Sequence, residues 1–219
     1  MASEERSFIP GIGRIIAGDA CVSEGAAWLA ERETRFADAL TLTGPLPLRR
    51  KPEGFAQLLS AIVSQQVSVA SANAIWKRMK DAKLTGPRNI LRASDDDLRA
   101  AGLSRQKIRY ARALAEARID FKSLRDAPDE EVIATLVEVP GIGVWTAEIY
   151  AMFSLGRADV FAHGDLALQE AARVLFDLAA RPKEREMRQM ADAWSPWRSV
   201  AARILWAYYR VAKDREGIR

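Results

Sequence analysis

The chain has 219 residues, of which 49% are hydrophobic and 28% are charged, enough to bury a core as one large domain or as two lobes that share a cleft. Lysine and arginine total 33 against 29 acidic residues, so the formal net charge of +4 is compatible with a polyanionic partner without establishing one. The single cysteine, Cys21, excludes an internal disulfide, a four-cysteine zinc site and an iron–sulfur cluster held by four thiolates, and it indicates a cytosolic chain.

The N-terminal segment, residues 1–6, is polar and charged. It has neither the basic start nor the apolar centre of a signal peptide. No stretch of the chain is apolar for long enough to span a bilayer. We therefore expect a cytoplasmic protein with no membrane association.

Apolar residues recur at helical spacing once the first fifty residues are passed. That first part is rich in Gly and Pro, and we expect one short helix in it, near residues 24–40. Over residues 55–63 the apolar positions are three and four apart, which predicts a helix with Pro52 in its first turn. Residues 72–79 continue with the same period and predict a second helix.

The next three helices have recognisable ends. Ser94 caps the first of them, whose first turn holds three aspartates that offset the positive end of the helix dipole. Gly102 ends this helix, Ser104 starts the next one, and Pro128 opens the third.

The last third of the chain predicts three more helices. One spans residues 144–155, one follows Asp165, and a long one starts at Ser195-Pro196. A short extended piece, residues 159–161, lies between the first two. Because no segment alternates apolar and polar residues with period two, we predict an all-α fold of about ten helices.

The connection between two of these helices is unusually short. Residues 136–147 contain the turn Pro140-Gly141-Ile142-Gly143, in which glycines let the backbone turn sharply and approach another surface closely. The N–H groups at the start of the following helix suit a phosphate oxygen, so the turn can grip a DNA backbone without reading bases. An ordinary αα-hairpin packed inside a bundle has the same pattern.

Asp165 lies downstream of this turn, in a segment that covers residues 161–166. A carboxylate at a helix start is ordinarily a cap. Together, however, the turn and Asp165 resemble the helix-hairpin-helix, Gly/Pro/Asp superfamily of DNA glycosylases, in which a catalytic aspartate follows a Leu-Pro-Gly-Ile/Val-Gly hairpin. Before Asp165 the chain has His163-Gly164 where the family often has an acidic residue or Pro.

Within that superfamily the chain is most similar to the compact form of the DNA-3-methyladenine glycosylase II family. Three further segments carry this resemblance, namely residues 61–68, 102–107 and 194–199. The resemblance implies two helical lobes that flank a cleft within one glycosylase domain. One lobe is expected to combine residues 1–50 with the C-terminal part, and the other to cover residues 51–160.

The resemblance also implies a monofunctional hydrolase of base excision repair. Such an enzyme flips a damaged base out of double-stranded DNA and hydrolyses its N-glycosidic bond, with Asp165 as the catalytic carboxylate. Cationic alkylated purines such as 3-methyladenine and 7-methylguanine are the expected substrates, because a base that is already positive is a good leaving group. Trp145 occupies the position of the nucleophilic lysine of bifunctional members, so no lyase activity is expected.

Three aromatic residues match the base pocket of the family: Trp145, Trp206 and Tyr150. Their electron-rich faces would attract a cationic base. For Trp206, on a long amphipathic helix, simple core packing is an equally good interpretation. Tyr150 is also placed to face the core of its own helix.

The matching DNA-binding positions fall into two groups. The first is the hairpin, with Gly141, Ile142, Gly143 and Thr146. The second is the pair Gln65 and Gln66, which interrupts an apolar helix face. Gln66 best matches the wedge that fills the gap left by the flipped nucleotide, although polar residues at a helix end can equally be caps.

The backbone carbonyls of Val137, Val139 and Ile142 match a site for a monovalent cation, Na⁺ or K⁺, in the family's hairpin. No other cofactor is expected, in particular no iron–sulfur cluster. The resemblance further implies a monomer that works at the bacterial nucleoid.

Two other interpretations remain open. A non-catalytic helix-hairpin-helix DNA-binding module would keep the hairpin and leave Asp165 only its capping role. A glycosylase for oxidised or mismatched bases would have the same fold, but the missing cysteine cluster and Trp145 argue against it. The sequence does not separate a 3-methyladenine specialist from an enzyme that also accepts hypoxanthine.

Overall fold

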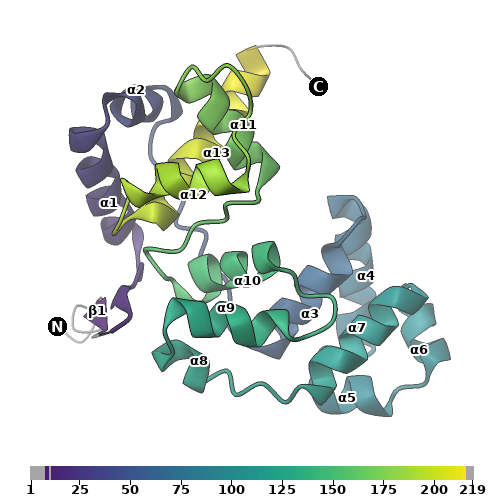
Figure 1. Cartoon of the computed structure of the whole chain (residues 1–219). Helices are drawn as coiled ribbons and strands as arrows, with labels where there is room; N and C mark the ends of the chain where they lie inside the picture. Colours follow the sequence, from purple (N-terminus) through teal and green to yellow (C-terminus); the bar gives the residue numbers. More distant parts are fainter. Residues whose placement is uncertain (1–7, 10, 216–219) are drawn as a thin grey trace. The chain divides into compact units, whose positions relative to one another are not determined.

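The computed structural model describes residues 8–9 and 11–215 (Figure 1). The chain divides into two units, which we call the terminal unit (residues 1–50 and 151–219) and the central unit (residues 51–150). The central unit is therefore an insertion between the two halves of the terminal unit. Within the described residues both units are almost entirely helical, so the predicted all-α fold is confirmed.

The terminal unit contains a short β-ribbon and helices from both ends of the chain. Its elements are β1 (Phe8–Ile9), β2 (Gly13–Arg14), α1 (Asp19–Arg32), α2 (Thr34–Thr43), the π-helix η1 (Ala151–Leu155), α11 (Leu166–Leu175), α12 (Glu184–Asp192) and α13 (Arg198–Arg215). The two strands pair antiparallel, with Phe8 opposite Arg14.

Helix α13 forms the centre of the terminal unit and contacts α1, α2 and α11 (Figure 1). The amphipathic character predicted for this helix is confirmed, because the side chains of Val200, Ala201, Ile204 and Leu205 on one of its faces are fully buried. Burial of such a stripe, more than intrinsic propensity, keeps a helix in place.

The central unit contains eight helices within the described residues. They are α3 (Phe55–Ser64), α4 (Val69–Asp81), α5 (Pro87–Arg92), α6 (Asp95–Ala100), α7 (Arg105–Glu116), α8 (Ser123–Asp126), α9 (Asp129–Val137) and α10 (Val144–Tyr150). Helix α7 contacts α3, α5 and α6, and α9 packs beside α10 (Figure 1). The cap predicted for α6 is confirmed, since Ser94 and Asp97 form a reciprocal capping box.

Several predicted boundaries were wrong. The single helix expected over 24–40 is two helices, because Glu33 is extended (φ −139°) and its side chain accepts a hydrogen bond from the N–H of Arg35. Pro52 lies outside α3, which begins after Gly54. The last helix starts at Arg198, and the helix expected over 144–155 changes to π geometry at residue 151.

The extended piece expected at residues 159–161 is a loop and not a strand. Its neighbour Arg157 forms an isolated bridge with Ile15 instead. The described residues contain thirteen α-helices, more than the ten predicted, because short helices such as α5 and α8 carry too few apolar positions to show a period. None of the described helices combines the length and the hydropathy that crossing a membrane requires.

Aromatic packing holds α2 in the terminal unit. Phe36 is fully buried, and its ring lies edge-on to Phe176 and Trp194 at centroid distances of 5.7 and 5.4 Å. We expect Phe36→Ala to lower the free energy of unfolding by about 3–5 kcal/mol, because the surrounding rings cannot close the cavity. Urea unfolding measures this loss. Leu42→Ala in the same helix is the control, since Leu42 is 42% exposed and its truncation should cost less than about 1 kcal/mol.

Candidate active site

Asp165 lies at the N-terminus of α11, in the terminal unit. Its Oδ1 accepts hydrogen bonds from the backbone N–H groups of Ala167, at 2.9 Å, and Leu168, at 3.0 Å. The predicted capping role of Asp165 is thus confirmed. These bonds hold the carboxylate at the start of α11, where the first N–H groups of the helix point outward.

A third donor reaches the same oxygen from another helix. The indole Nε1 of Trp206 in α13 lies 3.2 Å from Oδ1 of Asp165. Trp206 is half-buried, and its ring packs at a centroid distance of 5.7 Å against Phe153 of the π-helix. Three N–H groups therefore fix the orientation of the carboxylate, and an aromatic surface lies directly beside it. A capping carboxylate alone does not need the indole.

Arginines surround the Trp206 side of this cluster. The guanidinium of Arg203 is buried over the ring of Phe153 and donates to the backbone oxygens of Ser199 and Leu48. Burial, reinforced by repulsion from Arg49 and Arg50, lowers the pKa of Arg203 to about 9. Neither Phe153 nor these arginines stood out in the sequence, because nothing in their local pattern distinguishes them from ordinary helix and loop residues.

The helix-hairpin-helix turn lies in the central unit, between α9 and α10 (Figure 1). Gly141 has φ +95°, and the N–H of Ile142 donates to the carbonyl of Val139 at 3.0 Å. A Cβ atom at position 141 would lie only 2.4 Å from Cγ of Tyr110. Position 141 therefore requires glycine for two reasons, its backbone angle and its contact with α7.

The exposed face of the hairpin is formed by the start of α10. Trp145 is 48% exposed, while Ile142 and Thr146 are buried. Gly143 has no neighbouring atom within 4 Å of the place where a Cβ would lie. Because the first N–H groups of a helix have no partner within the helix, this open surface suits an anion such as a phosphate.

The two glutamines after α3 differ in their surroundings. Gln65 is half-buried, and its Nε2 donates to the carbonyl of Gly141 at 2.9 Å, which ties the end of α3 to the hairpin. Gln66 is exposed and adopts φ +56°, a conformation that a residue with a side chain rarely takes without a tertiary reason. The resemblance favoured Gln66 as the wedge, and the structure shows that the surroundings of the two glutamines differ.

Lys107 of α7 also stabilises the end of α3 beside the hairpin. Its Nζ donates to the carbonyl of Val63, in the last turn of α3, at 2.6 Å, and burial lowers its pKa. Together with the Gln65 bond and the contact of Tyr110 with Gly141, this bond joins α3, α7 and the hairpin into one connected cluster.

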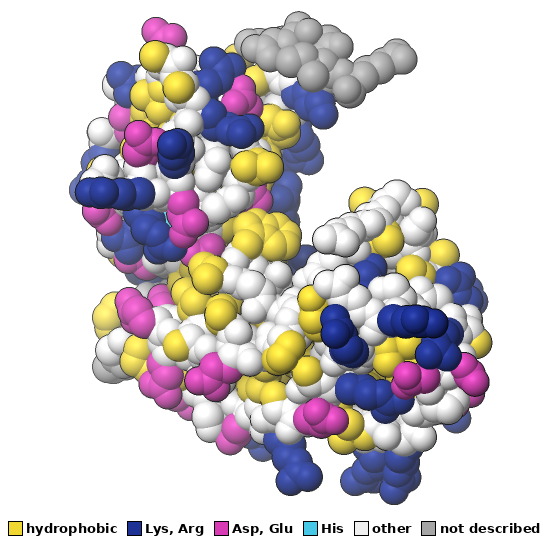
Figure 2. Space-filling view, turned by 45° about the vertical axis from the view of Figure 1, so that its right-hand side comes forward, with side chains coloured by type: hydrophobic (Ala, Val, Ile, Leu, Met, Phe, Trp, Pro, Cys, Tyr) yellow, Lys and Arg dark blue, Asp and Glu magenta, His cyan; other side chains and the backbone are white. Residues whose placement is uncertain are grey.

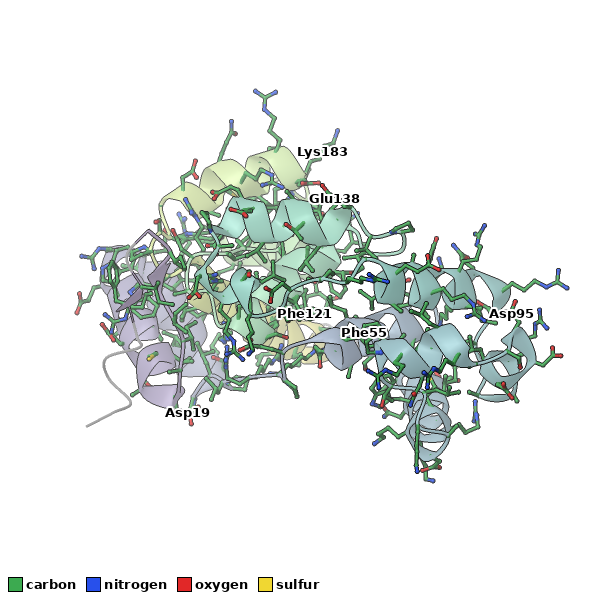
Figure 3. The ribbon with its side chains drawn as sticks, turned by 90° about the horizontal axis from the view of Figure 1, so that it is seen from below. Asp19, Phe55, Asp95, Phe121, Glu138 and Lys183 are labelled. Atoms are coloured by element: carbon green, nitrogen blue, oxygen red, sulfur yellow. The ribbon has the colours of Figure 1, made fainter. Side chains whose placement is uncertain are left out.

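Tyr150 lies in the core of the central unit. It is 3% exposed, and its Oη accepts the N–H of Gly54 at 2.8 Å, at the start of α3. Burial raises its pKa. The ring of Phe121, a residue that is labelled in Figure 3, lies at a centroid distance of 6.4 Å from that of Tyr150. These contacts match the interpretation of Tyr150 as a residue that faces the core of its helix.

The candidate site residues are distributed over both units. Asp165 and Trp206 belong to the terminal unit, while Trp145, the two glutamines and the hairpin belong to the central unit. A base pocket built from Trp145 and Trp206 together stays a prediction. Lys and Arg are interspersed with Asp and Glu on the visible surface of each unit (Figure 2), which agrees with a small net charge.

Comparison with known proteins agrees with this arrangement. Residues 59–197 match the model of the HhH-GPD superfamily base excision DNA repair proteins. DNA-3-methyladenine glycosylase 1 of Schizosaccharomyces pombe is 32% identical over 178 residues, which cover 77% of this chain and 78% of that protein.

Solved structures show the same relationship. A DNA-3-methyladenine glycosidase from Bacillus halodurans superposes with a TM-score of 0.78 at 35% identity, covering 88% of this chain and 91% of that one. The 3-methyladenine DNA glycosylase of Schizosaccharomyces pombe in complex with abasic DNA gives a TM-score of 0.73 at 30% identity, covering 84% and 95%. The chain thus belongs to the HhH-GPD superfamily of base excision DNA repair proteins, among its DNA-3-methyladenine glycosylases.

Proposed function

We propose that this protein removes alkylated purines, such as 3-methyladenine and 7-methylguanine, from double-stranded DNA by hydrolysing the N-glycosidic bond. The observation that carries the proposal is the carboxylate of Asp165, held by two helix N–H groups and the indole of Trp206. The names of its relatives support the substrate class, and the solved complex of one relative with abasic DNA supports binding of DNA.

The proposed reaction needs few protein groups. Cleavage of the bond between the base and C1′ builds positive charge on the sugar, and the fixed carboxylate of Asp165 stabilises that charge and orients the attacking water. The ring of Trp206 beside it offers a surface on which a flipped cationic base can stack. An alkylated base departs neutral, so no strong general acid is required.

The enzyme is proposed to be monofunctional. Trp145, at the position of the lysine nucleophile of bifunctional relatives, has no amine with which to form a Schiff base. Its product is therefore an abasic site on an intact strand. Gel analysis of product DNA without alkaline treatment tests this point, since a lyase would leave a nicked strand.

The central unit is proposed to hold the DNA. The hairpin residues Gly141, Gly143 and Thr146 are proposed to present backbone N–H groups to a phosphate, while Ile142, whose N–H closes the turn on Val139, contacts the DNA as part of the same turn. Ile142 and Thr146 also anchor the turn by burial. Gln66, exposed on a left-handed backbone, is proposed as the wedge that fills the emptied base position. Gln65 is given a supporting role, because its amide is engaged by Gly141.

The carbonyls of Val137, Val139 and Ile142 are proposed to bind Na⁺ or K⁺ at the hairpin. The local geometry fits such a site, because α9 ends at Val137 and the last carbonyls of a helix have no partner within it. The carbonyl of Val139 accepts one hydrogen bond, from Ile142, and keeps a second lone pair. A bound cation would bring positive charge to the turn and strengthen its hold on a phosphate.

Release of free bases from methylated duplex DNA tests the proposal. We expect chromatography of the supernatant to show 3-methyladenine after incubation with the protein. DNA binding without release of any methylated base would contradict the catalytic proposal and favour the binding-module alternative. That alternative leaves the bond between Trp206 and Asp165 without a purpose. Light scattering would test the proposal that the protein acts as a monomer.

The Trp206 indole gives a second, finer test. We expect Trp206→Phe to lower the single-turnover rate of base release by about tenfold, because the phenyl ring keeps the stacking surface and loses the hydrogen bond to a charged group. Trp28→Phe, in the half-buried tryptophan of α1, is the control and should leave the rate unchanged. Equal rates for both variants would mean that the indole N–H does not orient Asp165.

A further inference from the structure

Arg49 lies beside the proposed base-stacking surface. Its Cζ is 5.8 Å from the centroid of the Trp206 ring, the same ring that donates to Asp165. Its backbone has φ +54°, in the left-handed region that side-chain-bearing residues rarely occupy. Arg49 therefore combines an unfavourable backbone conformation with an exposed side chain whose guanidinium lies over the ring of Trp206.

The charges near Arg49 are mostly of its own sign. Partial burial lowers the pKa of Arg49, and repulsion from Arg210 lowers it further. Arg210 lies one helical turn after Trp206 on α13. Arg203 lies almost one turn before Trp206 and is repelled by Arg49 and Arg50. Within the described part of the chain, no ion pair links Arg49 to a carboxylate. Within the described residues, Arg49 therefore contributes an excess positive charge beside the ring of Trp206.

This excess affects the two kinds of leaving base differently. When the bond between C1′ and the base nitrogen breaks, its electron pair leaves with the base, and the oxygen of a water molecule then bonds to C1′. A cationic base becomes neutral in this step, whereas a neutral base becomes an anion that afterwards takes up the proton released by the water. A guanidinium nearby repels the first kind before reaction and stabilises the second kind as it departs.

We propose that Arg49 tunes the lesion range of this enzyme, by raising the rate of excision of neutral purine lesions such as hypoxanthine relative to that of cationic ones such as 7-methylguanine. This inference rests on the proposed glycosylase function, because it concerns the same site. Asp165 stabilises the positive charge on the sugar for both classes of lesion, whereas Arg49 interacts only with the charge of the leaving base.

The test compares two substrates in the parent and in Arg49→Met, which keeps an apolar side chain of similar length and removes the charge. Single-turnover rates are measured at saturating protein on a duplex with one hypoxanthine and on a duplex methylated with dimethyl sulfate, in which release of 7-methylguanine is followed. We expect the ratio of the hypoxanthine rate to the 7-methylguanine rate to fall by about fivefold or more. Arg49→Lys keeps the charge and should retain the parent ratio.

Arg35→Met is the matched control. Arg35 also lies over an aromatic ring of the terminal unit, with its Cζ 5.2 Å from the centroid of Phe176. Phe176 follows the far end of α11, about 16.5 Å from Asp165 at the helical rise of about 1.5 Å per residue. Loss of this cation–π contact should leave the ratio unchanged.

Three results would overturn the proposal. An unchanged ratio in Arg49→Met would show that the charge does not discriminate between lesions. An equal fall in both rates with weaker DNA binding would make Arg49 a phosphate contact. If Arg49→Met does not fold, Arg49→Gln is compared with Arg49→Lys instead. Equal ratios of the hypoxanthine rate to the 7-methylguanine rate in these two variants would refute the proposal. A parent that releases neither base would refute the proposed function itself, a result distinct from the other outcomes.

Discussion

Asp165→Asn is expected to lower the rate of base release by at least about a hundredfold while duplex binding stays within about twofold of the parent. Asparagine has the same shape, caps helices as well as aspartate does, and still offers an oxygen to Ala167, Leu168 and Trp206. The substitution therefore removes the negative charge while it keeps these three hydrogen bonds. Because the carboxylate is proposed to stabilise positive charge on the sugar, the loss should fall on the chemical step.

Single-turnover release of 3-methyladenine and a parallel binding titration on abasic-site DNA measure the two quantities separately. Glu33→Gln is the matched control, because Glu33 also caps a helix of the terminal unit with its carboxylate and has no indole donor among its contacts in the structure. If Asp165→Asn released bases at the parent rate, Asp165 would be a cap only and another group would have to perform the chemistry.

Gly141→Ala is expected to lower both stability and DNA binding. The new Cβ would lie 2.4 Å from Cγ of Tyr110 on a backbone with φ +95°, so the turn must move away from α7. We expect the free energy of unfolding to fall by about 1–3 kcal/mol and the dissociation constant for duplex DNA to rise by at least about tenfold.

Gly143→Ala separates these two effects. Position 143 has open space around it and no left-handed backbone, so its alanine variant should keep the parent melting temperature. It should still weaken DNA binding, because the added methyl group stands between the helix start and a phosphate. Gly86→Ala, equally unhindered but at the start of α5, should change neither property. If both hairpin variants bound duplex DNA as tightly as the parent, the proposal that the hairpin binds a DNA phosphate would be contradicted.

The features that could be predicted most accurately from the sequence are those that depend on the local residue pattern. The apolar faces of α3 and α13, the cap at Ser94 and the tight turn at Gly141 follow from spacing and from the special properties of Ser and Gly, and the structure confirms each of them. Membership in the glycosylase family followed from several short segments in the right order, and the comparisons confirm it.

Features that depend on long-range contacts could not be predicted. The bond between Trp206 and Asp165 joins residues 41 positions apart, and the bond between Gln65 and Gly141 joins residues 76 apart. No local pattern distinguishes Gln65 from Gln66 or assigns Arg49 to the ring of Trp206. The break at Glu33 was missed because a one-residue interruption hardly disturbs the helical period on either side of it.

The interruption of the terminal unit by the central unit has a consequence for synthesis of the protein. Helices α1 and α2 leave the ribosome early, but α13, which they pack against, is made last. Until then the apolar faces that carry Leu29 and Phe36 have no partner from the C-terminal helices, whereas all eight helices of residues 51–150 are already complete. Folding on the ribosome should thus begin in the middle of the chain and close at its two ends, with the N-terminal helices exposed to chaperones in the interval.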